Sequence, residues 1–400
     1  MSDPGLTSRR RLAPLDGLRG IAILLVVMSH GWVMWPMGFI DTHAWLRPFF
    51  RSGNSAVTVF LVVSGFLSYR ALSSPNGLSR MQPMLSVARR IIRVGPTLWA
   101  MLTVLLVVAA VDQTDKATKD TNGRSIWHAL TYTYNWLIQG DLLETRPDLG
   151  HLWYLSVDMQ AFLLFALVAF VLRRRPVGLV AALACWYLLL VWWRFHSFET
   201  ESIWVSLNRT TTRMDAFILG ALAAALVGWL PREHQIWRVL APGTLVALVP
   251  ILVWCDTDAS FMRWGGTVLA LIVAVHIVAS TSLPPGHWQV SANPMLVRLG
   301  SMSLVLYIWH YPIFYFVRRH AEWPWGWQVL VGLITTWVVA RACELLIEGR
   351  VTRVLAHPSW ARARSEGLLH FGLGAAHQRL RQAGAEHPTV GRMLRRDGVG

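Results

Sequence analysis

Apolar runs long enough to cross a lipid bilayer recur along almost the whole chain. A transmembrane helix needs about 20 apolar residues. Runs of that kind can be placed at residues 14–34, 54–73, 91–111, 151–172, 177–194, 205–229, 237–255, 263–281, 299–318 and 327–347. Hydrophobic residues make up 54% of the chain and charged residues only 15%, a balance that a water-soluble core does not need. We therefore predict an all-α, polytopic membrane bundle of about ten transmembrane helices.

Arginine is concentrated in alternate connections between these runs. Short cytoplasmic segments are enriched in Lys and Arg, and this bias orients the helices. The basic connections contain Arg9, Arg10 and Arg11, then Arg70, Arg80, Arg89, Arg90 and Arg93, then residues 173–175, and then Arg232 and Arg238. Most acids fall in the opposite connections, although Arg318 and Arg319 depart from the pattern. The alternation predicts a multi-pass inner-membrane protein with both termini in the cytoplasm. We expect a membrane-embedded domain at 1–349 and a basic cytoplasmic tail at 350–400.

The formal charge of +15 has a topological and membrane-surface explanation, and no nucleic-acid motif competes with it. We therefore expect the lipid bilayer as a partner, and no nucleic acid. The cysteines Cys185, Cys255 and Cys343 are far apart and show no metal-ligand spacing. The sequence predicts neither a metal site nor a permanently bound cofactor.

Arg19 and His30 lie eleven residues apart inside the first apolar run. In a helix this spacing puts both side chains on nearly the same face, about 16 Å apart along the axis. Ionisable groups at membrane depth are costly and therefore favour a functional role. The alternative is that Arg19 extends to the headgroups and that His30 marks the opposite interface.

Further polar groups lie inside later runs. His151 and Asp158 share a helix face about two turns apart, and Arg213 and Asp215 are nearly adjacent. Tyr307 and His310 occur in the run that contains Pro312, whose missing backbone donor favours a bend. Structural alternatives exist for each: an interfacial histidine, a buried salt bridge, or packing. His276 stands alone, and we expect a hydrogen-bonded core histidine there.

The longest polar connection, 112–150, contains an aromatic stretch around Trp127, Tyr132, Tyr134 and Trp136. Amphipathic rings of this kind are typical of the headgroup region, so the stretch predicts an interfacial helix or a re-entrant segment. A lid over a substrate entrance is the alternative interpretation.

In the predicted topology these residues separate into two zones. Several guanidinium groups gather near the cytoplasmic side, where they favour a multiply anionic ligand such as the phosphates of coenzyme A; they belong to Arg19, Arg70, Arg89, Arg90 and Arg93. The second zone lies deeper or toward the outer leaflet and contains His30, His151, Asp158, Arg213, Asp215 and His310. A cluster of arginines at the cytoplasmic side, followed by a buried imidazole deeper in the membrane, suits a cytoplasmic thioester donor. The acyl group of such a donor must reach an acceptor in the membrane.

Five segments in order resemble the signatures of one family. LDGLRGIAILLVVMSH, VFLVVSGFLSYR, HLWYLSVDMQ, TRMDAFILGAL and LGSMSLVLYIWHYPI are similar to successive segments of the acyltransferase 3 family of integral-membrane O-acyltransferases. The resemblance runs from about residue 14 to 349. It implies an enzyme that uses acyl-CoA as co-substrate and acylates a hydroxyl, commonly on a cell-envelope saccharide or glycolipid and in some members on a secreted metabolite.

The same resemblance assigns residues to the site. Arg19 and His30 match the family's hallmark arginine and histidine, His151 and Trp153 match its His-Leu-Trp element, and Ser64 begins its Ser-Gly-Phe element. Asp158 stands where many relatives have glutamate, and the common Glu-x-Pro ending is absent after Glu348. The tail contains no Gly-Asp-Ser block of the kind found in the hydrolase-like domain of some relatives.

The mechanism that these residues favour is general-base catalysis. Neutral His30, its tautomer set by a carboxylate such as Asp158 or Asp215, removes the proton of the acceptor hydroxyl during attack on the thioester. Arg19 orients the donor or offsets charge on the oxyanion. We predict His30, Arg19, Asp158 and His151 as catalytic, and Arg70, Arg89, Arg90, Arg93, Ser64, Trp153, Arg213, Asp215, Tyr307 and His310 as substrate-binding.

Two other mechanisms remain open on the residues alone. An acyl-histidine intermediate would pass the group outward in two steps. Alternatively, buried charges, a broken helix and several histidines are also typical of a proton-coupled transporter or exporter. A membrane scaffold that only binds lipid or carbohydrate is a further, non-catalytic possibility.

Overall fold

The computed structural model describes residues 4–72, 83–140, 142–230, 235–284 and 287–356. All regular secondary structure in these ranges is helical. The predicted basic tail beyond Ala356, and the arginines Arg80 and Arg232, lie outside the described residues.

The helices follow one another with short connections. The first half of the chain forms α1 (Pro4–Met34), α2 (Phe39–Thr42), η1 (Ala44–Leu46), α3 (Arg47–Phe50), α4 (Gly53–Leu72), α5 (Pro83–Val111), α6 (Lys119–Leu130), α7 (Tyr134–Gly140), η3 (Pro147–Leu152), α8 (Trp153–Val171) and α9 (Pro176–Thr200). The second half forms α10 (Ile203–Asn208), α11 (Thr210–Val227), α12 (Gln235–Trp254), α13 (Asp258–Ser260), η4 (Phe261–Gly265), α14 (Gly266–Ser282), η5 (Val290–Ala292), α15 (Pro294–Ser301), α16 (Ser303–His320), α17 (Trp325–Cys343), η6 (Glu344–Glu348) and α18 (Gly349–Ala356).

Nine helical stretches among the described residues are long and apolar enough to cross a membrane. They are Ala13–Met34, Gly53–Leu72, Met84–Val111, Pro147–Val171, Pro176–Thr200, Ile203–Val227, Gln235–Trp254, Asp258–Ser282 and Trp325–Ala356. The predicted span at 299–318 is not among them. Its helix is interrupted at Met302, between α15 and α16, and the α16 sequence contains two histidines and two arginines. The chain is a multi-pass membrane protein.

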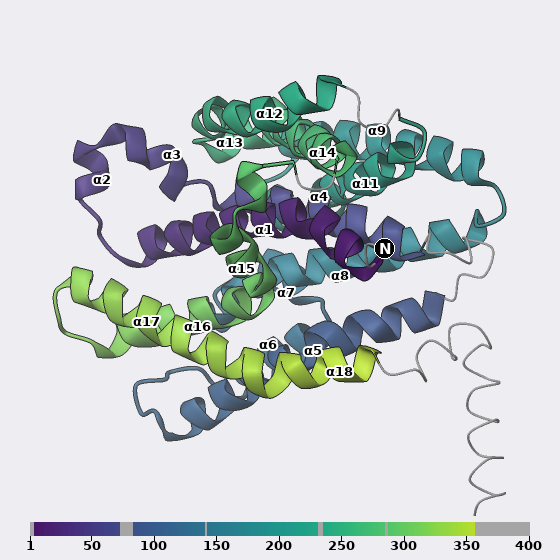
Figure 1. Ribbon diagram of the computed structural model, residues 1–400. Coiled ribbons are helices and arrows are strands. Elements are labelled where there is room, and N and C mark those ends of the chain that lie inside the picture. Colours follow the sequence, from purple (N-terminus) through teal and green to yellow (C-terminus); the bar gives the residue numbers. More distant parts are fainter. Residues whose placement is uncertain (1–3, 73–82, 141, 231–234, 285–286, 357–400) are drawn as a thin grey trace, which may run out of the picture.

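Helix α1 occupies the middle of the bundle (Figure 1). It packs against α4, α15 and α16, while α11 packs against α4, α8, α9 and α14. The outer helices are much less covered by protein. In an 18-residue apolar stretch of α9, 17% is buried, against 72% in the corresponding stretch of α4. Because α9 and α12 display large apolar side chains outward, we expect them to face lipid. Helix α1, with its polar residues, is therefore surrounded by protein rather than by lipid.

Small residues permit the closest of these contacts. A Cβ atom added at Gly65 of α4 would lie 1.8 Å from the carbonyl oxygen of Phe217, and one added at Gly220 of α11 would lie 2.0 Å from that of Val62. The two glycines thus let the backbones of α4 and α11 touch, as small residues commonly do between membrane helices.

The long connection at 112–150 folds into α6, α7 and the start of η3. Tyr134 is fully buried, and its backbone N–H donates a hydrogen bond of 3.0 Å to Ser156 Oγ of α8. Gln160 of α8 donates a hydrogen bond of 2.7 Å to the carbonyl of Tyr132, whose φ is 55°. The connection is therefore bound tightly to α8, and its role as a lid stays a prediction.

Candidate active site

His30 and His310 form the central contact of the candidate site. His30 comes from α1 and His310 from α16, and the two ring nitrogens His30 Nδ1 and His310 Nε2 are 2.7 Å apart. The His310 ring is fully buried, whereas His30 is partly exposed. The sequence did not predict this partnership, because it joins residues 280 positions apart.

The direction of this hydrogen bond follows from the other nitrogen of His310. His310 Nδ1 lies 3.0 Å from the carbonyl of Leu306 and 2.8 Å from that of Tyr307. Carbonyl oxygens only accept, so Nδ1 bears the proton and, in the neutral ring, Nε2 is an acceptor. His30 Nδ1–H therefore donates to His310, which leaves an unprotonated lone pair on His30 Nε2. The partner that fixes the tautomer is thus a histidine, and the predicted carboxylate partner is wrong.

His151 completes a cluster of three imidazoles. Its ring centroid is 5.7 Å from that of His310 and 5.0 Å from that of Tyr311, and Tyr311 also lies edge-on to His30 at 4.6 Å. His151 Nε2 is 3.2 Å from the carbonyl of Ile308 and therefore donates to it, while Nδ1 is buried without a partner. The hydroxyl of Tyr307 donates to the backbone carbonyl of His151. His30 and His151 therefore each carry one unprotonated ring nitrogen.

No group of three or more His, Cys, Asp or Glu side chains within the described ranges has the geometry to hold a metal ion.

Asp158 is paired with Arg90 of α5. Arg90 donates to Asp158 Oδ2 and also to Ser64 Oγ at 2.9 Å and Ser68 Oγ at 3.2 Å. Its guanidinium also lies 4.4 Å from the centre of the Phe162 ring, within range of a cation–π interaction. The structure therefore joins the predicted Ser64, Arg90 and Asp158 in one contact group.

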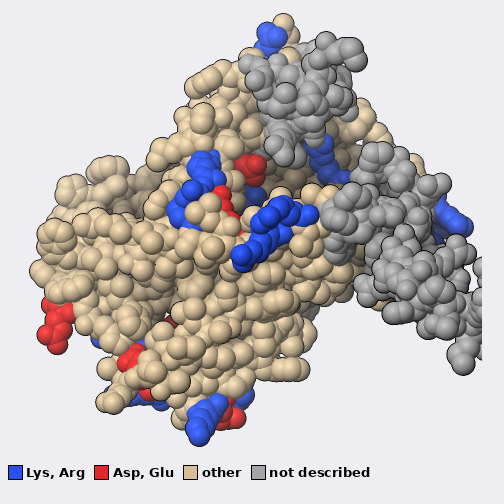
Figure 2. Space-filling model, turned by 60° about the horizontal axis from the view of Figure 1, so that its bottom comes forward, with Lys and Arg blue, Asp and Glu red and all other residues tan. Residues whose placement is uncertain are grey.

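The other predicted arginines spread over the same end of the bundle. Arg19 is mostly buried and forms a salt bridge of 3.2 Å with Asp16 one turn earlier. Arg93 is exposed on α5 and interacts electrostatically with Arg19, Asp16, Glu348 and Arg90. Arg89 is also exposed on α5, and the Arg70 guanidinium stacks 5.9 Å from the Phe66 ring. Figure 2 shows basic side chains gathered around acidic ones on one face of an otherwise largely uncharged surface.

Two tyrosines connect this group with the histidines. Tyr154 interacts electrostatically with Asp158, Arg90 and Arg19, and its ring meets that of Tyr307 edge-on at 5.2 Å. Tyr307 in turn lies 5.3 Å from His151 and 5.8 Å from His310. Tyr154 and Tyr307 thus link the arginine end with the histidine cluster through charge interactions on one side and ring contacts on the other.

Asp215 forms its ion pair with a neighbouring helix. Asp215 Oδ2 accepts a hydrogen bond of 2.8 Å from Arg194 of α9, and both side chains are 3% exposed. Arg213 instead donates to the carbonyl of Asn54 at 3.0 Å, and its guanidinium lies near the rings of Trp153 and Phe261. Arg213 and Asp215 are therefore not hydrogen-bonded to each other, because their neighbours on other helices provide the partners.

His276 is a hydrogen-bonded core residue, as predicted. Its Nδ1 lies 3.0 Å from both Thr244 Oγ1 and the carbonyl of Ala241, and its Nε2 lies 3.1 Å from the hydroxyls of Ser291 and Ser280. The ring joins α12, α14 and η5.

Sequence reasoning missed Arg194, Tyr154, Tyr311 and Arg146. Tyr154 and Tyr311 directly follow or adjoin the predicted Trp153 and His310, so proximity in the sequence was an available signal. Arg194 ends a predicted apolar run and resembled an interfacial residue. Arg146 lies in a polar connection, where a buried arginine has no sequence signature.

The model of a protein family described as an acyltransferase domain matches residues 12–343. The chain belongs to the acyltransferase 3 family. It is similar to the protein named "Putative membrane-bound transacylase BcsY" of Komagataeibacter xylinus, with 27% identity over 90% of this chain and 88% of that protein. It is also similar to O-acetyltransferase OatA of Staphylococcus aureus (strain NCTC 8325 / PS 47), with 24% identity over 78% of this chain. The match covers 52% of OatA, so it extends over only about half of that relative. No solved structure matches the chain.

Proposed function

We propose that this acyltransferase moves a short acyl group, such as acetyl or succinyl, from acyl-CoA to a hydroxyl of a cell-envelope saccharide or glycolipid. His30 is the general base. The observation that supports this role is the hydrogen bond from His30 Nδ1 to His310 Nε2, because the two carbonyls at His310 Nδ1 fix its direction. The result is an unprotonated His30 Nε2 on a partly exposed ring, which is the state that a base requires.

The arginine end is the proposed donor site. Arg19 and Arg93 supply positive charge near the start of the apolar stretches of α1 and α5, and Arg70 and Arg89 add to it. Guanidinium groups bind phosphate oxygens well, so this end suits the phosphates of CoA. Because the donor is cytoplasmic, we propose that this end faces the cytoplasm, in agreement with the arginine-rich connections.

Arg90 has a proposed positioning role. Its guanidinium donates to Asp158, Ser64 and Ser68. We assign it to holding Asp158 and Ser64 in place along the path between donor site and histidines. Asp158 Oδ1 is buried and makes no hydrogen bond within the described part of the chain, so it is available to a bound substrate.

In the proposed step, the acceptor hydroxyl oxygen attacks the thioester carbonyl carbon while His30 Nε2 takes the hydroxyl proton. The carbon–sulfur bond then breaks, and the CoA thiolate leaves with the proton that His30 returns. The charge that forms on the His30 ring is shared with His310 through the Nδ1–H hydrogen bond. His151 Nδ1, buried and without a partner, orients the acceptor by accepting a hydrogen bond from a hydroxyl.

The acceptor class rests on two kinds of support. Relatives of this chain are named O-acetyltransferase and membrane-bound transacylase. The histidine cluster is also bordered by the aromatic rings of Tyr307 and Tyr311. Aromatic faces with polar edges suit a sugar or glycolipid headgroup.

The test is transfer of radiolabelled acetyl from acetyl-CoA to envelope saccharides and glycolipids extracted from bacterial cells. The purified protein in liposomes should label an acceptor and release CoA thiol in equal amounts. The matched control is His196→Ala, which removes an exposed histidine on the lipid-facing helix α9 and should leave the rate unchanged. Movement of the extracted saccharides across the liposome membrane without consumption of acetyl-CoA would instead establish a carrier and overturn the proposal.

A further inference from the structure

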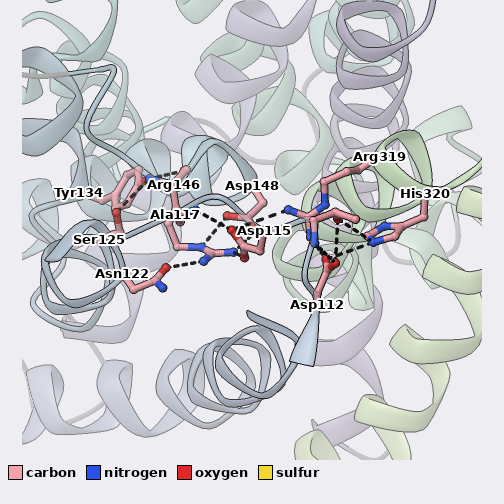
Figure 3. Close-up of polar contacts among 11 residues, drawn as sticks. Asp112, Asp115, Ala117, Asn122, Ser125, Tyr134, Arg146, Asp148, Arg319 and His320 are labelled. Atoms are coloured by element: carbon pink, nitrogen blue, oxygen red, sulfur yellow. Dashed lines mark hydrogen bonds and ion pairs between the residues drawn. The ribbon is translucent and has the colours of Figure 1, made fainter. Parts of the chain in front are cut away.

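A polar network outside the histidine cluster ties three segments of the chain together (Figure 3). We call it the Arg146 network. Its members come from the α5–α6 connection, the start of η3 with the residue before it, and the last turn of α16. They are Asp112, Asp115, Arg146, Asp148, Arg319 and His320. None of these residues belongs to the site proposed above.

Arg146 is the centre of the network and is 2% exposed. Its Nε donates to Asp148 Oδ1 at 3.0 Å, and one terminal nitrogen donates to Asp148 Oδ2 at 2.6 Å and to Asp115 Oδ2 at 2.9 Å. The other terminal nitrogen donates to the side chain of Asn122 in α6. Burial acts against the charge, but the carboxylates of Asp148 and Asp115 raise the pKa of Arg146 above its ordinary value. The guanidinium is thus charged and bound from two separate connections.

The last turn of α16 joins the same network. Arg319 donates to Asp112 and lies 3.9 Å from Asp115. His320 Nδ1 lies 2.9 Å from the carbonyl of Phe316 and donates to it, and its Nε2 lies 3.1 Å from Asp112 Oδ2. Because Asp115 contacts both Arg319 and Arg146, it connects α16 with the segment that leads into η3.

The two elements joined in this way hold the proposed reactive groups. Asp148 and His151 lie in η3, three residues apart, while α16 holds Tyr307, His310 and Tyr311. Asp148 also interacts electrostatically with Tyr311, whose ring contacts both His30 and His151. A shift of η3 relative to α16 would therefore move His151 away from its position beside Tyr311 and His310.

The energetics favour a positioning role over a purely stabilising one. A buried ion pair contributes little net stability, because the loss of hydration offsets most of the attraction. It does restrict geometry, since the bidentate contact of a guanidinium with a carboxylate allows only one arrangement. Tyr134 adds a further restraint by donating a hydrogen bond of 2.8 Å to the backbone carbonyl of Arg146.

We propose that Arg146 is a positioning residue that fixes η3 against α16, so that His151 Nδ1 faces the acceptor hydroxyl. This inference rests on the proposed function, because it assigns Arg146 an effect on acyl transfer through His151. A misplacement of about 1 Å at a reacting group is enough to lower the rate of an enzyme about 100-fold.

The test compares Arg146→Gln, Arg146→Lys and Asp115→Asn in liposomes with acetyl-CoA and the extracted envelope fraction. Arg146→Gln should lower kcat about 10- to 100-fold with an unchanged KM for acetyl-CoA, because the donor site is at the other end of the bundle. Arg146→Lys should recover part of kcat, and Asp115→Asn, which keeps the Asp148 contact, should lose less than Arg146→Gln. The matched control is Arg124→Gln, which breaks an exposed pair with Glu144 on the same connection and should leave kcat unchanged.

Two further readouts separate positioning from simple loss of structure. Arg146→Gln should add no loss of rate to a His151→Asn variant, because both changes disable the same group. Hydrogen exchange should increase at residues 147–152 in Arg146→Gln while α4 and α11 keep wild-type protection. If Arg146→Gln fails to fold, Asp115→Asn and its exchange pattern decide the question.

The outcomes distinguish this inference from the proposed function. Wild-type kcat in both Arg146→Gln and Asp115→Asn, or unchanged exchange at residues 147–152, would overturn the positioning role and leave the transferase intact. The positioning role would also be rejected if Arg146→Gln lowered the rate of the His151→Asn variant by the same factor as it lowers the rate of the wild type. A wild-type protein that transfers no acetyl group would overturn the proposed function, while the exchange measurement would still report on the contact between η3 and α16.

Discussion

Replacement of His310 tests the tautomer argument directly. His310→Leu removes the acceptor of the His30 Nδ1–H bond and leaves a ring-sized apolar group at a fully buried position. His310→Gln keeps a side-chain oxygen that accepts from the same hydrogen. We expect both variants to fold, with His310→Leu less stable by about 1–3 kcal/mol because a buried donor loses its partner.

The effect on rate follows from the strength of that hydrogen bond. A net contribution of about 0.5–1.5 kcal/mol corresponds to about a 2- to 13-fold change in rate, since about 1.36 kcal/mol is tenfold. Removal of the base itself lowers the rate more, by about 100- to 10,000-fold. His310→Leu should therefore lie between the wild type and His30→Ala, and His310→Gln should lie closer to the wild type.

The assay is acetyl transfer from radiolabelled acetyl-CoA at saturating donor, measured for the wild type, His310→Leu, His310→Gln and His30→Ala in the same liposomes. Donor binding serves as the control, because neither histidine contacts the arginine end. A His310→Leu variant with the wild-type rate would refute the reasoning. A rate as low as that of His30→Ala would assign the base to the pair rather than to His30.

Three more predictions follow from contacts away from the histidines. Gly65→Ala should lower the free energy of unfolding of the detergent-solubilised protein by about 1–3 kcal/mol, because a Cβ there would clash with the α11 backbone. Gly243→Ala, which has open space around it, should leave thermal unfolding unchanged. Asp215→Asn should lower stability by about 3–5 kcal/mol because it leaves the buried charge of Arg194 unpaired, and unchanged thermal unfolding would contradict the assignment. Partial burial tends to raise the pKa of Asp112, but hydrogen bonds from Thr114 and His320 and the charge of Arg319 outweigh it and hold this pKa below its ordinary value. The stability that Asp112 contributes is therefore present above about pH 4 and is lost as the pH falls further, so the wild type should lose this stability in acid and Asp112→Asn should not.

The sequence predicted the membrane bundle because twenty-residue apolar runs have few other solutions in lipid. The predicted span at 299–318 shows the limit of that reasoning. Residues 299–318 are apolar enough on average to suggest a span, yet the helix is interrupted at Met302 and its second part is packed among other helices. Whether an apolar run faces lipid or protein depends on its neighbours, which the local sequence does not contain.

For the candidate site, too, the sequence predicted the residues but not their partners. Helical spacing placed Arg19 and His30 on one face, and the family resemblance selected Ser64, His151 and Trp153. The partners of these residues were not accessible to such reasoning. His30 pairs with His310, Asp158 with Arg90, and Asp215 with Arg194, each across a contact between helices distant in sequence. Spacing within one helix predicts which side chains share a face, but only packing decides what they meet.

The most direct test of the central claim is a paired measurement on His30→Ala: binding of acetyl-CoA at equilibrium, and acetyl transfer in a single turnover. The account predicts binding within about twofold of the wild type and transfer slower by at least about 100-fold. Transfer at the wild-type rate with binding intact would contradict it, because the base would then have to be another group.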